Sequence, residues 1–340
     1  MIGYYAHHHG AGHLTRLQAI AGAMNEDVWG LSSTPAPAAW TGGWTQLARD
    51  DDPDPAALSA DGDPTAHGVL HWAPRGHLGL ARRSAQLANW VVEEHPRALV
   101  VDVSVEVAVL ARLCGVPTVV VALPGARLDR THQLAYDSAE ALLAPWPRGT
   151  HDRDWPSAWT AKTWFVGGIS RFDHLSPSPP VVPPSTHGRT VLVLWGAGGR
   201  TTTAADVDAA RAATPTWTWV ERVPGVPGDG SIWEALASAD VVVTHGGQNA
   251  VAEVAAARRP AVVVAQPRPF DEQVATARAV ESRQIAVGLS AWPSADEWPD
   301  LLERAISRGG AGWAQWSTGH GAAVAAAHLR TVGLPSPLPA

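Results

Sequence analysis

The groups best suited to chemistry lie together between Ala239 and Ala277. An apolar run that predicts a buried strand, Asp240–Thr244, is followed by the loop His245-Gly246-Gly247 and then by a helical pattern. Glycines let a backbone come close to a ligand, and the free N–H groups of a helix's first turn attract anions. His245 could add a hydrogen-bond donor, and Asn249 could cap the helix or touch the anion. The pattern therefore predicts a phosphate site at this loop.

Acidic and amide side chains follow in positions that suit sugar hydroxyls. Glu253 lies one helical turn after Asn249, on the same face, and a carboxylate there can accept two hydrogen bonds from a ribose diol. After the next predicted strand, Asp271, Glu272 and Gln273 open another helix beside the first. Each residue also has an ordinary structural role open to it, such as a cap for Asp271 or a solvated helix position for Glu253. Together they predict a site where polar side chains reach ribose or other sugar hydroxyls beside a phosphate.

A second set of candidates opens the chain. The apolar run Ile2–Ala6 leads into His7-His8-His9-Gly10-Ala11-Gly12-His13, and a helical pattern follows. His13 would lie in the first turn of that helix. Imidazole titrates near neutrality and can take a proton from an attacking hydroxyl, so His13 is the candidate general base, with capping or packing as its alternative. If the chain is extended here, His7 and His9 point to one side and His8 to the other.

Asp102 ends the predicted strand Ala98–Val103, at the edge of the sheet where sites form. It could orient His13 or bind a substrate, but capping the next helix is an equal alternative, and Ser104 and Glu106 share that uncertainty. His67 and His71 have a metal-compatible spacing only on a helix, which Gly68 and Pro74 argue against. We therefore expect no metal ligands.

The elements that position these residues fall into two halves. Each half begins with strand, glycine loop and helix, which is the start of a βαβ unit, and the second such loop is Gly196-Ala197-Gly198-Gly199. Near-continuous valine runs suit strands buried on both faces. The sequence predicts an α/β protein of two Rossmann-like parallel-sheet domains facing across a cleft, over residues 1–172 and 190–320. A proline-rich linker, 173–189, would join them, and residues 321–340 would hold a helix that could cross back.

Composition excludes several functional classes. The chain of 340 residues has a formal net charge of -7, which disfavours a general nucleic-acid binder. Its one cysteine excludes a disulfide framework within the chain and a cysteine-rich zinc module. We see no signal peptide and no apolar run of the roughly 20 residues that span a membrane, and we expect a cytoplasmic protein. Trp72 with the amphipathic stretch Gly76–Glu94 could touch an apolar ligand or a membrane surface, or simply pack on the sheet.

The segment from His245 to Gln273 resembles the donor-binding signature of GT-B glycosyltransferases, both the plant secondary-product type and family 28. The family pattern, His-x-Gly-x-Asn-Ser-x-x-Glu and later an acidic residue with Gln, corresponds here to His245, Gly247, Asn249, Ala250, Glu253, Glu272 and Gln273. By this resemblance the first three meet the donor diphosphate, Glu253 meets the ribose, and Glu272 with Gln273 meets the sugar. Asp271 leaves the acidic assignment open.

One departure is Ala250, which stands where the family has a Ser or Thr phosphate contact. Backbone N–H groups must then hold more of the diphosphate, or the loop with Gly198 and Gly199 must, which resembles the family's second glycine loop. At the other end of the chain, Gly10-x-Gly12-His13-x-x-Arg16 resembles the acceptor loop of these enzymes, with His9 beside it. It is also similar to the opening of UDP-sugar hydrolases of the same fold.

The resemblance implies an inverting glycosyltransferase that moves a sugar from a nucleotide diphosphate sugar, of the UDP or dTDP type, to a hydroxyl on a small-molecule or lipid-linked acceptor. It implies no cofactor and no metal, because helix N-termini would stabilise the leaving diphosphate. Two alternatives remain, a nucleotide-sugar hydrolase and a non-catalytic nucleotide-sugar-binding protein. An epimerase of similar architecture is more distant.

Overall fold

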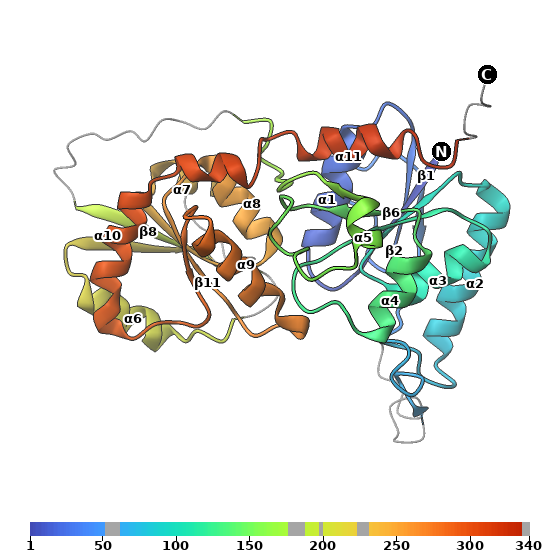
Figure 1. Cartoon of the computed structure of the whole chain (residues 1–340), viewed down its shortest axis with the longest axis horizontal. Helices are drawn as coiled ribbons and strands as arrows, with labels where there is room; N and C mark the ends of the chain where they lie inside the picture. Colours follow the sequence, from blue (N-terminus) through green and yellow to red (C-terminus); the bar gives the residue numbers. More distant parts are fainter. Residues whose placement is uncertain (52–61, 176–187, 197–199, 223–230, 335–340) are drawn as a thin grey trace.

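The computed structural model describes residues 1–51, 62–175, 188–196, 200–222 and 231–334. It contains two α/β domains that lie side by side (Figure 1), each built on an all-parallel sheet. The first sheet has the order β3-β2-β1-β4-β5-β6-β7 and the second β12-β11-β10-β8-β9. The predicted fold class, two Rossmann-like domains, is confirmed.

The first domain is built from these elements: β1 Ile2–Ala6, α1 Gly12–Gly22, β2 Val28–Ser32, β3 Trp44–Gln46, α2 Leu78–Glu94, β4 Leu99–Asp102, α3 Val105–Leu113, β5 Thr118–Val121, α4 Arg130–Ser138, β6 Ala141–Ala144, α5 Ser157–Ala161 and β7 Thr163–Phe165. The second domain has β8 Arg189–Leu194, α6 Ala204–Ala213, β9 Trp217–Arg222, α7 Ile232–Ser238, β10 Val241–His245, α8 Gln248–Ala257, β11 Ala261–Val264, η2 Pro269–Asp271, α9 Glu272–Ser282, β12 Val287–Leu289, η3 Ala295–Glu297, α10 Trp298–Arg308 and η4 Ala311–Gln315. The chain ends with α11 Gly321–Leu329.

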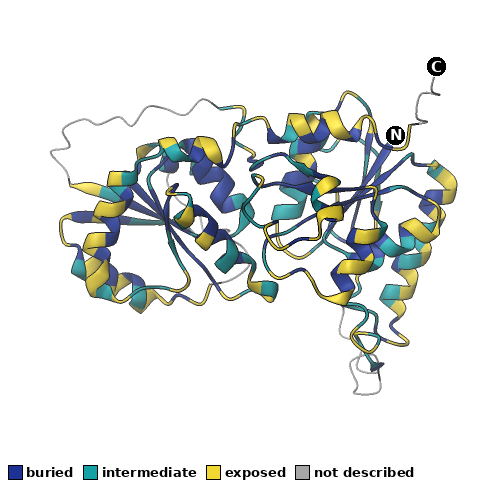
Figure 2. Cartoon of the chain, in the orientation of Figure 1, coloured by how far each residue is buried: buried dark blue, intermediate teal, exposed yellow. Residues whose placement is uncertain are grey.

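In each domain, alternate strand residues point to opposite faces of the sheet, and each face has its own hydrophobic core against the helices that cover it. In β1, Tyr5 faces the core shared with α2 and α3, while Tyr4 faces the core shared with α1 and α11. The valines of β10 and β11 divide in the same way. Figure 2 shows the result, with buried strands inside and exposed residues on the outer faces of the helices. None of the helices in the described part of the chain combines the length and apolarity needed to cross a bilayer.

The polypeptide passes between the domains twice, and the two crossings touch. After β7 the chain runs to Arg171 and Phe172, which contact Glu253 and Trp233 of the second domain. Most of the predicted linker, residues 176–187, lies outside the described part, and its bounds stay a prediction. The return crossing leads to α11, which packs on the first domain (Figure 1). The Gly168 N–H donates to the Trp316 carbonyl oxygen (2.9 Å), and the Ser317 hydroxyl donates to the Gly168 carbonyl oxygen (2.8 Å).

Several short elements were not predicted, among them β6, β7 and the edge strand β3. Each is a three- or four-residue strand, too short to show a period. The predicted helix from Asp271 instead begins at Glu272, because Phe270 and Asp271 both adopt left-handed backbone angles, with φ of 60° and 53°.

Candidate functional site

Sheet register brings His13 and Asp102 together. Strands β1 and β4 are parallel neighbours, with Ala6 opposite Asp102, so the loop after β1 and the end of β4 share one sheet edge. His13 lies at the start of α1, and its Nδ1 is 2.9 Å from Asp102 Oδ1. The carboxylate makes Nδ1 the protonated nitrogen, which leaves Nε2 as the basic one. Among the described residues Nε2 has no partner, and the side chain is 17% exposed.

Asp102 is fully buried and held by three side chains. Arg16 Nη1 donates to both carboxylate oxygens at 2.7 Å, and the Tyr4 hydroxyl donates to Oδ2 at 3.0 Å. Burial alone would raise the pKa of Asp102, but the charges of Arg16 and His13 outweigh it and hold the pKa at about 2. Asp102 is therefore a fixed anion behind His13. It does not cap α3, because that cap is the Ser104 hydroxyl.

The predicted phosphate loop lies at the end of β10. His245 Nδ1 accepts a hydrogen bond from the Gly247 N–H (3.0 Å), so the proton of the neutral ring lies on Nε2. That nitrogen is buried and has no hydrogen-bond partner in the described part of the chain. Burial, assisted by Arg268, lowers the pKa of His245 to about 4. The ring fills the space that a Cβ at Gly196 or Gly247 would need, since either would lie 2.4 Å from it.

Helix α8 begins directly after this loop with Gly247 as its N-cap and no side-chain cap. Its first-turn N–H groups therefore have no side-chain cap, and the His245 ring contacts the N-cap residue Gly247; uncapped N–H groups at a helix start favour an anion. Ala250 is buried in that first turn. The other glycines that the sequence placed near the phosphates, Gly198 and Gly199, lie outside the described residues.

The start of α8 also contacts the first domain. Asn249 Nδ2 donates to the Gly12 carbonyl oxygen (3.3 Å), and Arg16 Nη2 donates to Gln248 Oε1 (2.7 Å). The two glycine loops therefore face each other, and Arg16, which was assigned to the acceptor loop, connects Asp102 with the second domain. Gly10, also assigned to that loop, has a positive φ of 84° and no neighbour within 4 Å of a Cβ, which is the turn that leads into α1.

Glu253 lies one turn further along α8 and is buried. Its Oε1 is 2.9 Å from Arg171 Nε, and burial raises its pKa despite that cation. Arg171 comes from the first crossing and is half exposed. In this structure Arg171 thus forms an ion pair with Glu253, the carboxylate that the resemblance assigned to ribose binding.

The acidic and amide residues after β11 divide into separate roles. Asp271 is exposed and makes no capping bond. Glu272 Oε2 accepts from Arg127 Nη2 across the domain boundary (3.3 Å), while burial raises its pKa. Gln273 is 4% exposed, and its Oε1 accepts from the backbone N–H groups of Gly246 (3.1 Å) and Gln266 (3.0 Å). The side-chain carbonyl of Gln273 therefore holds the backbone of the predicted phosphate loop at Gly246.

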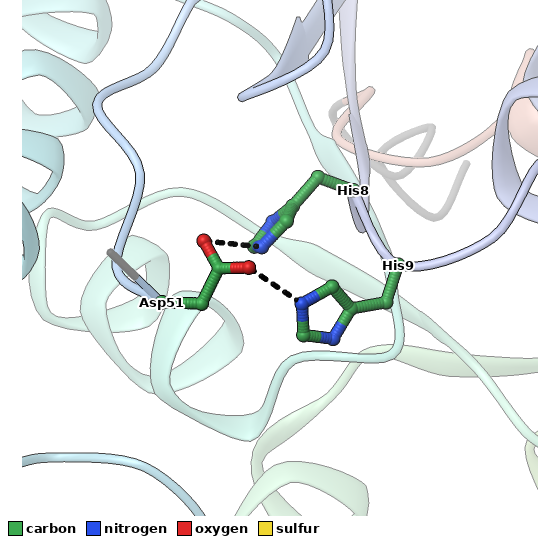
Figure 3. Close-up of side chains that lie close together, drawn as sticks. All are labelled: His8, His9 and Asp51. Carbon is green, nitrogen blue, oxygen red and sulfur yellow. Dashed lines mark hydrogen bonds and ion pairs between the residues drawn. The ribbon is translucent and has the colours of Figure 1, made fainter. Parts of the chain in front are cut away.

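The three histidines after β1 do not alternate. Their rings bunch together, with His7 stacked on His8 at 4.8 Å and inclined to His9 at 5.0 Å. The prediction of opposite directions is wrong because β1 ends at Ala6 and the chain then turns. His9, assigned to the acceptor loop, points to Asp51, with Nε2 and Oδ2 2.8 Å apart (Figure 3).

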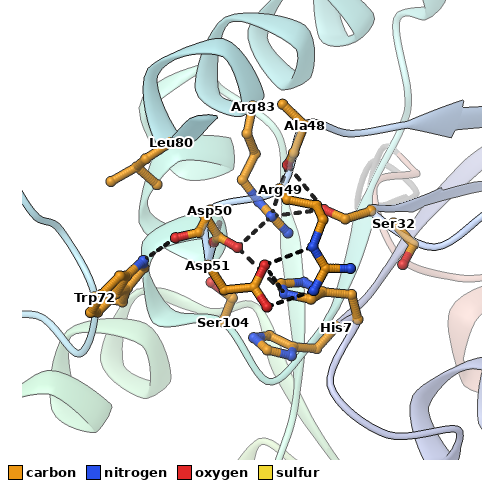
Figure 4. A network of polar contacts seen from close by, with 12 residues as sticks. His7, Ser32, Ala48, Arg49, Asp50, Asp51, Trp72, Leu80, Arg83 and Ser104 are labelled. Carbon is orange, nitrogen blue, oxygen red and sulfur yellow. Dashed lines mark hydrogen bonds and ion pairs between the residues drawn. The ribbon is translucent and has the colours of Figure 1, made fainter. Parts of the chain in front are cut away.

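These histidines line a cavity of about 540 Å³ in the first domain. Its apolar walls come from Leu80 and Leu87 of α2, Leu110 of α3, and Trp72. Its polar end holds Asp50, Asp51 and Arg83, which form the network in Figure 4. Sequence reasoning had singled out Trp72 but missed this polar end. The run Arg49-Asp50-Asp51 after β3 was the available signal, but β3 itself was not predicted.

His67 and His71 lie in turns and do not share a helix, as Gly68 and Pro74 indicated. His71 instead packs against His132 and Phe270, with tilted rings whose centroids lie 4.6 and 5.3 Å away. Phe270 comes from the second domain, and its carbonyl oxygen accepts from the Ala126 N–H (2.8 Å). Gly125 has a φ of 97°, and a Cβ at this position would lie 2.0 Å from the Phe270 carbonyl oxygen. The domains thus meet on this side as well.

Histidines with lowered pKa values, His132, His151 and His245 among them, predict acid sensitivity of the fold. Burial lowers the pKa of His151 to about 3 and those of His132 and His245 to about 4, all below the usual 6.5. The unfolded chain therefore binds more protons between those values and pH 6.5, so the unfolding free energy is full above 6.5 and falls as the pH drops. His151→Phe, in a site packed between Trp146 and Trp316, is expected to flatten that slope by up to about 1.4 kcal/mol per pH unit. Urea unfolding at about pH 7 and about pH 5 measures it, and equal slopes in both proteins would contradict it.

The chain is similar to known proteins both in sequence and in fold. Residues 226–307 match the model of the glycosyltransferase family 28 C-terminal domain. Three solved structures superpose over nearly the whole chain. Spinosyn rhamnosyltransferase SpnG complexed with spinosyn aglycone has a TM-score of 0.64 and 16% identity, and covers 98% of this chain and 100% of its own. The calicheamicin glycosyltransferase CalG4 has a TM-score of 0.62 and 16% identity, with 99% of each chain covered.

The third, MurG of Acinetobacter baumannii, has a TM-score of 0.61 and 14% identity, and covers 97% of this chain and 98% of its own. At these identities the likeness shows a common fold, which is GT-B. No curated protein matches the sequence.

Proposed function

We propose that this chain, a member of the GT-B superfamily by its fold and by the family 28 domain match in its second half, is an inverting glycosyltransferase. It would take a sugar from a nucleoside diphosphate sugar, of the UDP or dTDP type, and attach it to a hydroxyl of an acceptor bound in the first domain. The observation that carries the proposal is that the candidate base and the candidate anion site lie close together. The basic face of His13 and the anion-binding start of α8 come from different domains and are linked through Gly12 and Asn249 at 3.3 Å.

In the proposed reaction the acceptor O–H gives its proton to His13 Nε2. The acceptor oxygen forms a bond to the anomeric carbon as the bond from that carbon to the diphosphate oxygen breaks, and configuration inverts. Asp102 stabilises the imidazolium that forms. The charge that develops on the leaving diphosphate is met by the first-turn N–H groups of α8 and the His245 Nε2–H, which cost no reorganisation because they are already in place.

The donor's nucleoside is expected at Glu253. A ribose diol would donate to the carboxylate that Arg171 now contacts, and Arg171 is half exposed, so its displacement to solvent is cheap. Ala250 offers no hydroxyl, and the backbone of α8 must therefore hold the phosphates there. No part of this reaction requires a metal at the diphosphate.

The acceptor is expected in the cavity of about 540 Å³. A volume of that order suits a drug-sized molecule, and its apolar walls from α2 and α3 suit an apolar body with few polar groups. The polar end contains His7, whose ring lies 5.9 Å from that of His13. An apolar aglycone with a hydroxyl at that end would present it to the proposed base.

Donor binding and Glu253 can be tested together by thermal shift with UDP, dTDP, GDP and their sugars. One nucleotide is expected to raise the melting temperature, corresponding to about 2.7 kcal/mol at 100 times its dissociation constant. Glu253→Gln should weaken that nucleotide about 10–100-fold, as the loss of a charged hydrogen-bond acceptor does. Glu303→Gln, at an exposed ion pair with Arg189 in the same domain, is the control and should bind normally. Equal affinity of both variants would remove Glu253 from the site.

Turnover separates the alternatives. Transfer requires donor and an apolar hydroxylated acceptor together, whereas a hydrolase would release sugar from the donor alone at a comparable rate. A protein that binds the donor but turns it over in neither assay would be the non-catalytic alternative. A protein that binds none of the nucleotides would contradict the proposal itself.

A further inference from the structure

His8, His9 and Asp51 form a compact donor set that the proposed reaction does not use. His9 Nε2 lies 2.8 Å from Asp51 Oδ2, and His8 Nε2 lies 3.3 Å from Asp51 Oδ1 (Figure 3). One ligand atom from each residue lies within 4.8 Å of the others. Tetrahedral ligands at about 2.0–2.2 Å from a Zn²⁺ ion lie roughly 3.3–3.6 Å from one another, so small side-chain rotations suffice to place an ion between these three.

His8 provides an independent sign of a missing ligand. Its side chain is 2% exposed, and neither ring nitrogen makes a hydrogen bond within the described residues. Its contacts with Asp50 (3.6 Å) and Asp51 (3.3 Å) are close but not hydrogen bonds. A buried imidazole that makes no hydrogen bond costs free energy, because the water that solvated it has been removed. A cation at Nε2 would satisfy that nitrogen.

The surrounding groups hold the three residues in place. His7 stacks on the His8 ring with an interplanar angle of 11°, and its Nδ1 accepts from the His9 backbone N–H (3.1 Å). Arg49 donates to both oxygens of Asp51, at 2.9 and 2.6 Å. A carboxylate has about four acceptor positions, so Asp51 can keep Arg49 as an outer partner while it binds an ion. Arg49 is also 48% exposed and can move away.

The ligand types in this trio indicate which metal ion it would bind. Two imidazoles and one carboxylate suit Zn²⁺ and similar transition metals, whereas Mg²⁺ and Ca²⁺ prefer oxygen ligands alone. A second trio, His71, Asp129 and His132, is less suited, because the cation beside it is buried. Arg127 is 7% exposed with its Nη1 3.0 Å from His132 Nε2, whereas Arg49 beside the first trio is 48% exposed. The first trio is therefore the candidate.

We propose that His8, His9 and Asp51 bind a Zn²⁺-type dication whose open coordination position faces the acceptor cavity. All three residues line that cavity. With three protein ligands, a fourth position is left for an outside donor, as in zinc sites that bind substrate. In the proposed transferase the ion would hold an acceptor oxygen at the polar end of the cavity, so this second part rests on the proposed function. The expectation of no metal ligands was based on His67 and His71 and did not consider this trio, in which Asp51 follows His9 by 42 residues.

The experiment uses the whole chain without an affinity tag, titrated with Zn²⁺ by calorimetry and with Co²⁺ by visible absorption. Wild type is expected to bind one equivalent and to give the intense d–d bands of a four-coordinate Co²⁺ site. His9→Gln and Asp51→Asn should each weaken binding by more than the roughly 10–100-fold that loss of an outer partner costs. His67→Gln, at an 81% exposed histidine beside Asp63, is the matched control and should bind as wild type does.

Equal metal affinity in wild type, His9→Gln and Asp51→Asn would overturn the site and leave the three residues as an ion-pair network. So would a Co²⁺ spectrum of the octahedral aqueous type. Nucleotide binding measured on the same samples is independent of this result, because the ion and the α8 loop lie in different domains. If the protein bound no nucleotide, the proposed transferase function would be contradicted. If it bound nucleotide but no metal, only the proposed metal site would be contradicted.

Discussion

His13→Ala is expected to lower kcat for sugar transfer by about 10²–10⁴-fold, the range that positioned general bases contribute. The variant removes the only group that the proposed reaction uses to accept the acceptor proton. Its side chain is 17% exposed and packs at the rim of the first domain, so the fold should tolerate the change. Donor affinity should stay close to that of the wild type, because the proposed donor contacts lie in the second domain.

The control for this variant is Thr15→Ala, two residues away on the same helix. Thr15 is only partly buried, and its hydroxyl bonds back to the Ala11 carbonyl oxygen (3.0 Å), away from Asp102. It should transfer sugar at nearly the wild-type rate. If His13→Ala lost donor affinity and kept its kcat at saturating donor, His13 would be a binding residue and the proposed base would be wrong.

Asp102→Asn is expected to reduce the unfolding free energy by about 3–5 kcal/mol, because it leaves Arg16 as an uncompensated buried charge. Arg16 is 5% exposed and gives two of its bonds to this carboxylate. The same change is expected to reduce transfer, because an amide can hold His13 in the wrong tautomer. Chemical denaturation measures the first effect, and kcat with saturating donor measures the second.

The direction of the pH effect follows from the pKa of Asp102. It is about 2, below the usual 3.8, so the carboxylate's contribution is fully present above pH 3.8 and is lost as the pH falls through about 2. Tyr4→Phe removes one hydrogen bond from the same carboxylate and should cost only about 1.5–3 kcal/mol. A loss smaller in Asp102→Asn than in Tyr4→Phe would contradict the charge argument.

The main elements of both domains were predictable because their signals are local. Valine runs mark β10 and β11, and the glycine loops after β1 and β10 mark where a strand gives way to a helix. The His13–Asp102 approach was open as one of three alternatives for Asp102, since both residues follow or end parallel strands at the same edge of the sheet. What local signals could not decide was the order of the strands, which makes β1 and β4 neighbours.

Other parts of the site depend on contacts between distant segments. Arg171 reaches Glu253 only because the chain crosses early between the domains. The Asp51 contact with His9 depends on the path after the edge strand β3, whose three residues carry no pattern. Gln273 had the right type for a sugar contact, but its carbonyl oxygen bonds two backbone N–H groups. Residue type alone could not distinguish a ligand contact from support of a loop.

The paired crossings at Gly168 and at Trp316–Ser317 limit how the two domains can move. Two covalent connections that are hydrogen-bonded to each other act as one short axis. Translation of one domain along the other would stretch both connections, whereas rotation about the axis changes only a few backbone angles, several of them at glycines. We therefore expect rotation about this axis to be the main relative motion of the domains. A donor that separates Asn249 from Gly12 would then need an angular opening between the domains.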